Sequence, residues 1–174
     1  MRSTIWEILG TILIALVIFG LVQLTLEGRE IQYRCMEPNL KEDQHILINK
    51  AAYFFHSPQR GDVIIFRYPR DREQIYVKRI IAIPDDTIEI KDGIVYINGS
   101  PCEEPYVSSD TEGGLPKQTI PPDRYFVMSD NRNGSWDSRY WGTVPRGDII
   151  GKTWLCYWPP GEWGLAPNYS WSSE

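Results

Sequence analysis

The sequence is poor in the residues on which metal and nucleic-acid sites depend. Its 174 residues include two histidines, His45 and His56, and three cysteines without a Cys-x-x-Cys pair, so we expect neither a metal site nor another cofactor. The formal net charge of -5 argues against nucleic acid as a partner, because a general nucleic-acid binder needs a basic face. Cys35, Cys102 and Cys156 cannot all pair within the chain. A disulfide between Cys102 and Cys156 is an alternative, but we favour buried free thiols.

Charge is also missing from one long stretch near the N-terminus. Residues 8–26 read ILGTILIALVIFGLVQLTL, about the ~20 residues that a helix needs to cross ~30 Å of hydrocarbon. No small-x-small cleavage site follows, so residues 1–29 are predicted to be an uncleaved signal anchor and not a secretory signal peptide. The few flanking charges favour a cytoplasmic N-terminus, with the bulk of the chain outside the cytoplasm.

Residues 30–158 predict a mainly β domain. Short runs rich in Val, Ile and Tyr alternate with turn residues, and the expected strands are residues 45–50, 61–68, 74–83, 87–90, 94–99, 124–129 and 149–158. Asp92-Gly93 supplies the positive φ of a tight hairpin between two of them. Residues 101–122 contain five prolines and are predicted to be a surface loop.

The C-terminal tail, residues 159–174, is interrupted by Pro and Gly, and we expect no strand in it. It carries Trp163, Tyr169 and Trp171. These aromatic residues either contact a membrane surface or a partner, or belong to a tail that folds back on the domain.

A candidate nucleophile follows the apolar stretch, in YRCMEPNL, where Cys35 stands. Histidine is the usual partner of a catalytic cysteine, but neither His45 nor His56 has a neighbouring Asp or Asn that suggests a pair. Lys78 lies inside IYVKRIIAI, where burial among apolar residues would make it a base. The alternative, in which Lys78 and Arg79 are edge-strand charges that face water, remains open.

A third stretch, MSDNRNGSWDSRYWGTVP at residues 128–145, is dense in small polar and charged residues directly after an expected strand. It is either a polar loop with ordinary turns or a loop that delivers Ser135 to the lysine. In the second interpretation Asp137 and Arg139 brace the loop as an ion pair.

In this order, behind an N-terminal span, these stretches resemble the type I signal peptidase family of membrane-bound Ser-Lys peptidases. CMEPNL is similar to the family's S-M-x-P-T-L and GDVIIFRYP to its G-D-V-x-x-F strand. YVKRIIAIPDD is similar to Y-V-K-R-x-x-G-x-P-G-D. MSDNRNGSWDSRYWGTVP is similar to M-G-D-N-R-x-x-S-x-D-S-R-x-W-G-x-V-P. Four motifs in register make the resemblance specific, and it covers nearly the whole chain.

The resemblance implies a coiled-sheet, barrel-like catalytic domain at the cell membrane, with an apolar face on the lipid bilayer. It implies cleavage of the signal peptides of secreted preproteins after small residues, and it leaves other membrane subunits open as partners. By position, the resemblance implies Cys35 as the nucleophile, Lys78 as the general base and Ser135 as the hydroxyl that orients the base. It implies that Asp137 and Arg139 are a supporting pair and that Met36 and Pro38 shape the turn. Tyr33 stands at the implied oxyanion position.

The chain departs from the pattern inside the motifs. Cys35 replaces serine, and three glycines are replaced by Ala82, Asp85 and Ser129. A thiol remains a nucleophile, but side chains at glycine positions could narrow a peptide cleft. Two alternatives to an active peptidase therefore stay open. One is an inactive relative that serves as a subunit or scaffold of a membrane complex. The other is an anchored β-domain with some other binding role, which requires Lys78 to be exposed and far from Cys35.

Overall fold

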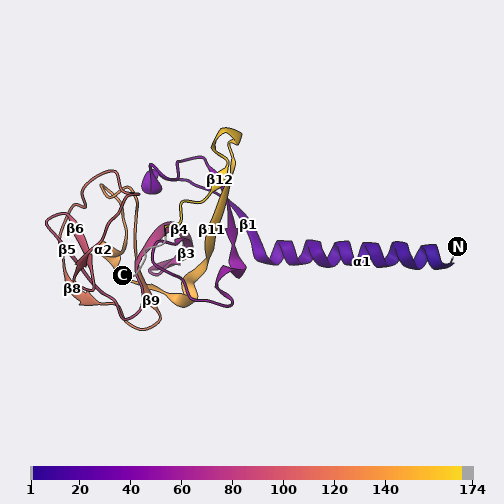
Figure 1. Cartoon of the computed structure of the whole chain (residues 1–174), viewed down its shortest axis with the longest axis horizontal. Coiled ribbons are helices and arrows are strands. Elements are labelled where there is room, and N and C mark those ends of the chain that lie inside the picture. Colours follow the sequence, from indigo (N-terminus) through magenta and orange to yellow (C-terminus); the bar gives the residue numbers. More distant parts are fainter. Residues whose placement is uncertain (1, 170–174) are drawn as a thin grey trace.

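The computed structural model describes residues 2–169. Helix α1 (Arg2–Thr25) projects from the domain as a single rod (Figure 1). Its part from Trp6 to Thr25 is long and apolar enough to cross a membrane. The helix ends one residue before the predicted limit at residue 26, because Leu26 begins strand β1 and pairs with Asn49.

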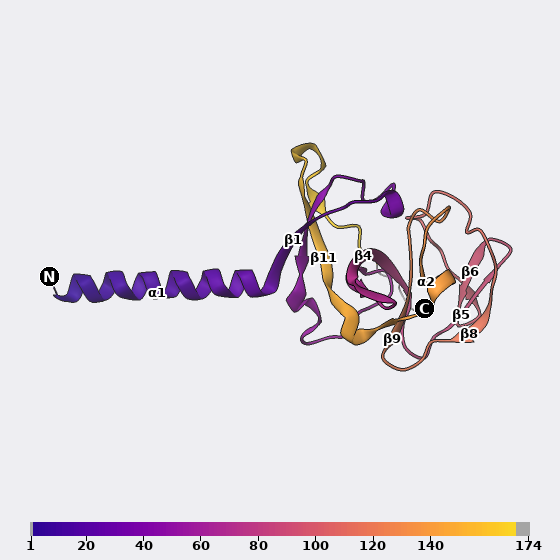
Figure 2. The ribbon, with the colours of Figure 1, turned by 180° about the vertical axis from the view of Figure 1, so that it is seen from behind.

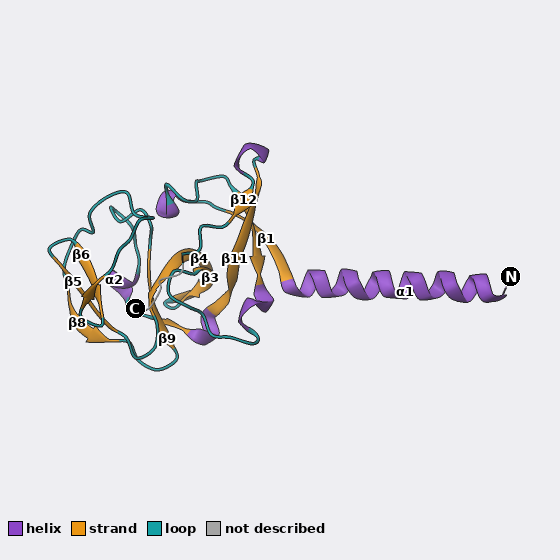
Figure 3. Ribbon diagram, viewed as in Figure 1, coloured by secondary structure: helices purple, strands orange, loops and turns teal. Residues whose placement is uncertain are grey.

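The larger sheet has eight strands in the order β1-β2-β11-β3-β4-β9-β10, with β12 paired to β11. All of the pairs within it are antiparallel. Its strands are β1 (Leu26–Glu30), β2 (His45–Asn49), β3 (Val63–Tyr68), β4 (Asp71–Ala82), β9 (Arg124–Met128), β10 (Val144–Pro145), β11 (Ile149–Trp158) and β12 (Gly164–Leu165). Figure 3 shows this sheet between α1 and the rest of the domain.

The smaller sheet has four strands in the order β7-β6-β5-β8 and lies at the end of the domain far from α1 (Figures 1 and 2). Its strands are β5 (Thr87–Lys91), β6 (Ile94–Ile97), β7 (Ser100–Pro101) and β8 (Leu115–Thr119). The predicted hairpin is confirmed, since Asp92 and Gly93 adopt φ of 52° and 79° between β5 and β6. The prediction of a mainly β domain behind one N-terminal helix is confirmed as well.

Short helical turns connect the strands. They are η1 (Arg34–Met36), η2 (Lys50–Tyr53), α2 (Ser138–Trp141), η3 (Arg146–Asp148) and η4 (Pro160–Glu162). Helix α2 begins after Asp137, whose side chain accepts a hydrogen bond from the Arg139 amide. An Asp at this position satisfies an amide that the helix itself leaves without a partner.

Strand β4 separates two of the three hydrophobic clusters in the core. Ile80 packs with Phe66 and Val127 in the first cluster, whereas Ile81 packs with Met128 in the second. Successive side chains of a strand point to opposite faces, so one strand contributes to both clusters. The third cluster contains Met36 with residues of β2 and β3, and so holds the last residue of η1 in the core.

The tail folds back on the domain as far as Tyr169. The Tyr169 amide donates to the carbonyl of Gly61 at 3.1 Å, and a Cβ atom at Gly61 would lie 1.6 Å from the Tyr169 carbonyl oxygen, so this contact requires glycine. The prediction that the tail contains no strand was wrong, because β12 pairs with β11. Trp163 is exposed, Tyr169 packs against Tyr106 with ring centroids 5.7 Å apart, and Trp171 lies outside the described residues.

Candidate active site

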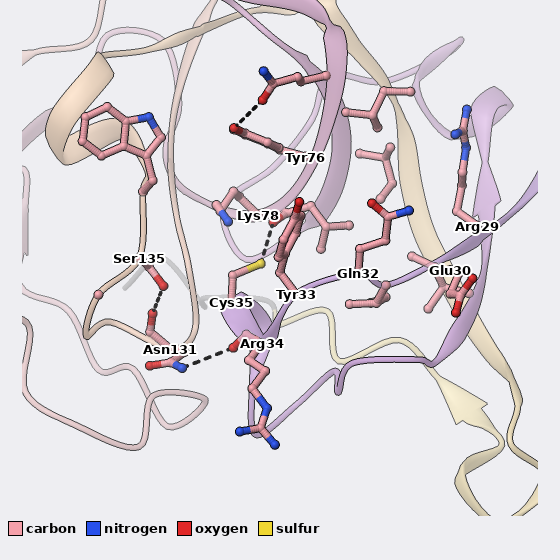
Figure 4. Close-up of a pocket in the computed structure, with 18 of the residues that line it drawn as sticks. Arg29, Glu30, Gln32, Tyr33, Arg34, Cys35, Tyr76, Lys78, Asn131 and Ser135 are labelled. Carbon is pink, nitrogen blue, oxygen red and sulfur yellow. Dashed lines mark hydrogen bonds between the residues drawn. The ribbon is translucent and has the colours of Figure 1, made fainter.

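A pocket of about 830 Å³ opens between three segments that are distant in sequence. These are residues 28–35 after and within β1, residues 73–78 of β4, and residues 131–136 of the loop after β9. Figure 4 shows Cys35, Lys78 and Ser135 around this pocket. The fold thus brings together the three residues that the motifs single out. His45 and His56 do not line the pocket.

Cys35 lies in the middle of η1 and is half-buried. Its neighbour Met36 is fully buried in the third cluster and anchors the turn. The backbone is held from the other side by Asn131, whose amide donates to the Cys35 carbonyl at 3.0 Å and whose side chain donates to the Arg34 carbonyl at 3.2 Å. The thiol itself donates weakly to the carbonyl of Val77, with Sγ 3.7 Å from the oxygen. The sulfur therefore lies beside the residue that precedes Lys78.

Lys78 is buried, with 5% of its surface exposed, so it is not an edge-strand charge that faces water. It pairs with Ile64 in the centre of the larger sheet, and its Nζ lies 5.7 Å from the centroid of the Tyr76 ring. Within residues 2–169 no hydrogen bond or ion pair engages this amine. A desolvated amine without a carboxylate partner has the surroundings that a general base requires.

Ser135 is buried at the pocket wall, and its hydroxyl donates to the carbonyl of Asn131 at 2.5 Å. In the described part of the chain no hydrogen bond joins Ser135 to Lys78, so the orienting role of Ser135 stays a prediction. Asp137 and Arg139 form the expected ion pair at 2.9 Å, buried beneath the loop and away from the pocket. Asp137 also accepts a hydrogen bond from the Ser129 amide, and so ties the loop to the end of β9.

The remaining predicted residues lie around η1. Tyr33 lines the pocket and is exposed, while Met36 and Pro38 do not line it. Met36 shapes the turn, since its carbonyl accepts hydrogen bonds from the amides of Asn39 and Leu40 at 3.0 and 2.8 Å. Pro38 is exposed in that turn.

One buried ion pair near the site was missed from the sequence. Arg79 and Asp130 are both fully buried and bonded at 2.6 Å, and Arg79 also donates to the carbonyls of Gly61 and Pro167. Burial raises the pKa of the Asp130 carboxyl, although the Arg79 guanidinium opposes the rise. Asn39 donates to the same carboxyl at 2.9 Å, so the pair connects β4, the loop and the segment after η1. The sequence signal for this ion pair was the arginine of the motif YVKR together with the aspartate of the motif MSDNR.

The glycine replacements differ in their surroundings. Asp85 adopts a φ of 70°, the left-handed conformation that glycine takes easily and that Asp tolerates better than most residues. Ala82 and Ser129 are fully buried. All three cysteines are free thiols, Cys102 and Cys156 included. Residues 2–169 contain no group of three or more His, Cys, Asp or Glu side chains that could hold a metal ion.

Comparisons with known proteins show the family of the chain. The family model of the signal peptidases, peptidase family S26, matches residues 4–158. The chain is 36% identical over 172 residues to a probable signal peptidase I-1 of Synechocystis, covering 94% of this chain and 88% of the relative. It is 32% identical over 168 residues to a signal peptidase I of Bacillus caldolyticus, covering 88% of each chain.

Among solved structures, a signal peptidase I from Enterococcus faecalis is similar with a TM-score of 0.51 and 33% identity. The match covers 55% of this chain and 96% of that chain. The family model extends over most of the chain and includes Cys35, Lys78 and the loop with Ser135. The chain therefore belongs to the signal peptidase family S26.

Proposed function

We propose that this protein is a membrane-anchored endopeptidase that cleaves the signal peptides of secreted preproteins after small residues. Cys35 is the nucleophile and Lys78 the general base. The observation that carries the proposal is the burial of Lys78 at the wall of the pocket that Cys35 lines, in a chain that belongs to the signal peptidase family. This placement also argues against an anchored β-domain of unrelated function, which requires Lys78 to be exposed and far from Cys35.

The reaction begins when the Cys35 thiol transfers its proton to the Lys78 amine. The thiolate adds to the scissile carbonyl carbon, and a hydrogen bond from Tyr33 to the resulting oxyanion assists. The intermediate collapses, the C–N bond breaks, and the lysine ammonium returns the proton to the leaving amine. Water then adds to the thioester with Lys78 again as base, which releases the signal peptide as a carboxylate and restores the thiol.

Supporting residues hold this arrangement. We propose that Ser135 orients Lys78 once its hydroxyl turns from the Asn131 carbonyl, and that the Asp137–Arg139 pair keeps the loop in place. Met36 and Pro38 shape the turn that presents Cys35. Helix α1 places the site at the cell membrane. We propose that the N-terminus is cytoplasmic and that residues 30–174 lie outside the cytoplasm, where a translocated signal peptide presents its cleavage site.

An inactive subunit of a membrane complex is the second candidate function. It is favoured by one observation, that no hydrogen bond joins the Cys35 thiol to the Lys78 amine within residues 2–169. Catalytic hydrogen bonds are often long in an enzyme without substrate, so this geometry is compatible with both candidates. Activity of the purified full-length chain separates them.

The test is a substitution series assayed for cleavage of a signal-peptide substrate. Cys35→Ala should abolish cleavage, and Cys102→Ser, which lies outside the pocket, serves as the matched control and should retain it. Cys35→Ser should retain activity only if Lys78 takes the proton of the serine hydroxyl, and Lys78→Ala should then lower that activity by about 10²-fold or more, since serine depends on its base. Absence of cleavage by both the parent and Cys35→Ser would favour the inactive subunit.

A further inference from the structure

Ser129, the residue directly after β9, has a buried hydroxyl without a partner. The residue is fully buried, and its Oγ is one of three buried side-chain polar atoms in residues 2–169 that make no hydrogen bond, with Trp141 Nε1 and Thr153 Oγ1. A buried hydroxyl that makes no hydrogen bond destabilises the folded state. We therefore expect the Ser129 hydroxyl, which is near the proposed active site, to have a hydrogen-bond partner in the working enzyme. The register of the sheet indicates which group that partner is.

Strands β4 and β9 pair antiparallel, with Arg79 opposite Met128 and Ile80 opposite Val127. Continuing this register by one residue places Ser129 opposite Lys78. Residues directly opposite in an antiparallel pair have Cβ atoms ~5 Å apart and side chains on the same face. The ion pair between Arg79 and Asp130 supports the extended register. Arg79 is opposite Met128, and Asp130 lies two residues after Met128, so both side chains lie on the face opposite to Lys78 and Ser129.

The packing on this face of the sheet supports the placement of Ser129 opposite Lys78. Lys78 shares its face with Ile80, and Ser129 shares its face with Val127, two positions away along each strand. Ile80 and Val127 both pack in the first hydrophobic cluster, with Tyr76 at its edge. The hydroxyl of Ser129 and the amine of Lys78 therefore lie on the same face of the sheet, at the place where that cluster ends and the pocket begins.

Ser135 Oγ donates to the carbonyl of Asn131 in this structure and reaches Lys78 only after it turns, so Ser129 offers the amine a second hydroxyl that needs no such turn. Ser129 also has a rigid backbone. Its amide donates to Asp137 at 3.1 Å, and its carbonyl accepts from Arg132 at 2.9 Å. A hydroxyl accepts from an ammonium and donates to a neutral amine, so a fixed hydroxyl can hold a lysine in both protonation states.

We propose that Ser129 is a positioning residue that holds the Lys78 amine in line with Cys35. The proposal rests on the proposed function and deepens it, because it assigns a role to a residue that replaces the glycine of the family's M-G-D-N-R motif. The hydroxyl acts through Lys78 and does not touch the substrate. In the working site, a turn of the lysine side chain brings its Nζ within hydrogen-bonding distance of Ser129 Oγ.

Ser129→Ala in the full-length chain removes one oxygen atom and tests the proposal. We expect kcat for a signal-peptide substrate to fall about 10-fold, with KM unchanged within about 2-fold, because the lost hydrogen bond orients the base and not the substrate. Thr153→Val removes another buried, unpartnered hydroxyl, from β11 outside the pocket, and should leave kcat unchanged. Ser129→Gly, which also lacks the hydroxyl, should show the same loss as Ser129→Ala.

The decisive comparison repeats Ser129→Ala in a Lys78→Ala background, where residual activity persists because a thiol ionises partly without a base. We expect no further loss there, since Ser129 acts through Lys78. An equal loss in both backgrounds, no loss with Ser129→Ala, or a gain with Ser129→Gly would overturn the proposal while the proposed function stands. Unchanged cleavage by Lys78→Ala itself would overturn this proposal together with the assignment of Lys78 as the general base.

Discussion

The three thiols of this chain differ in their surroundings, and the differences determine which of them can react. Cys35 lines the open pocket, whereas Cys156 is buried and its Sγ lies 3.2 Å from the carbonyl oxygen of Trp158. Burial, together with the negative charge of Glu104, raises the pKa of Cys102 to about 12. The thiolate is the reactive form of cysteine, so Cys102 stays protonated and unreactive under ordinary conditions.

We therefore predict that iodoacetamide at about pH 8 modifies Cys35 first and that cleavage activity disappears in step with this modification. Peptide mass spectrometry of the alkylated chain measures both. The variant with Cys102→Ser and Cys156→Ser is the control, and it should be alkylated and inactivated at the same rate as the parent. Inactivation that follows modification of Cys102 or Cys156 would contradict the assignment of Cys35.

Arg139 neutralises a carboxylate that has no access to water. Asp137 is fully buried, and it also accepts the amide of Ser129, so the pair fixes both ends of the loop. Arg139→Met should lower the free energy of unfolding by about 3–5 kcal/mol, because it leaves a buried charge without its partner. Urea unfolding at neutral pH measures the loss. Adding Asp137→Asn to Arg139→Met should recover part of it, and a double variant that is no more stable than Arg139→Met would refute this explanation.

At the candidate site, sequence reasoning indicated which residues lie together but not the bonds that they make. The motifs predicted Cys35, Lys78 and Ser135, and the fold places all three around one pocket. The contact of the thiol with Val77 and the bond from Ser135 to Asn131 depend on backbone positions that no motif specifies. The use of Ser129 required the register of β4 and β9, which local sequence does not determine.

At the scale of the elements, the turn between β4 and β5 is held by one carboxylate. Asp86 accepts hydrogen bonds from Arg60, from the Ile83 amide and from Asn98, and so connects this turn with the end of β6. Burial alone would raise the pKa of Asp86, but these hydrogen bonds, with the bond from Arg60 the largest, hold it below its usual value.

A carboxyl with a lowered folded-state pKa stabilises the fold above its unfolded pKa, near 4, and loses that contribution as the pH falls through the folded-state value. We predict that the free energy of unfolding falls in this acidic range and that Asp86→Asn makes the fall shallower. The difference between the two pH profiles from urea unfolding isolates Asp86 from the other carboxylates. Parallel profiles would show that Asp86 contributes nothing to the pH dependence.

The predicted strands were those with alternating apolar residues, and the missed ones lack that pattern. Strand β8 lies inside the predicted loop, because its sequence LPKQT is polar and mostly exposed and it pairs along one side with β5. Strand β1 reads LEGRE and is defined by its pairing with β2, which no local propensity indicates. Strand β12 has two residues on the edge of β11. Edge strands depend on a partner strand more than on their own side chains.

At the scale of the whole molecule, α1 and the domain are two parts whose surfaces suit different surroundings. The exposed apolar side chains of α1 suit a bilayer, and the helix leads directly into β1 at the near edge of the larger sheet (Figure 2). The connection has no linker, since the helix ends at Thr25 and the strand begins at Leu26. A helix that spans a membrane therefore holds the domain close to the surface of that membrane.

We predict that protease added to intact spheroplasts digests the domain, because the topology that we propose places residues 30–174 outside the cytoplasm. A tag placed after Glu174 follows the digestion on an immunoblot, and a cytoplasmic protein serves as the control for intact cells. Full protection before lysis, with digestion after it, would reverse the orientation and would separate the site from translocated signal peptides.

The most direct measurement of the central claim is intact-mass spectrometry of the full-length chain, quenched in acid during cleavage of a signal-peptide substrate. The proposed mechanism predicts a transient mass increase equal to the acyl part of the substrate, located at Cys35 by peptide mapping, and its disappearance as the cleaved signal peptide accumulates. Cys35→Ala should show neither adduct nor cleavage. Cleavage that persists in Cys35→Ala without an adduct would contradict the assignment of Cys35 as the nucleophile.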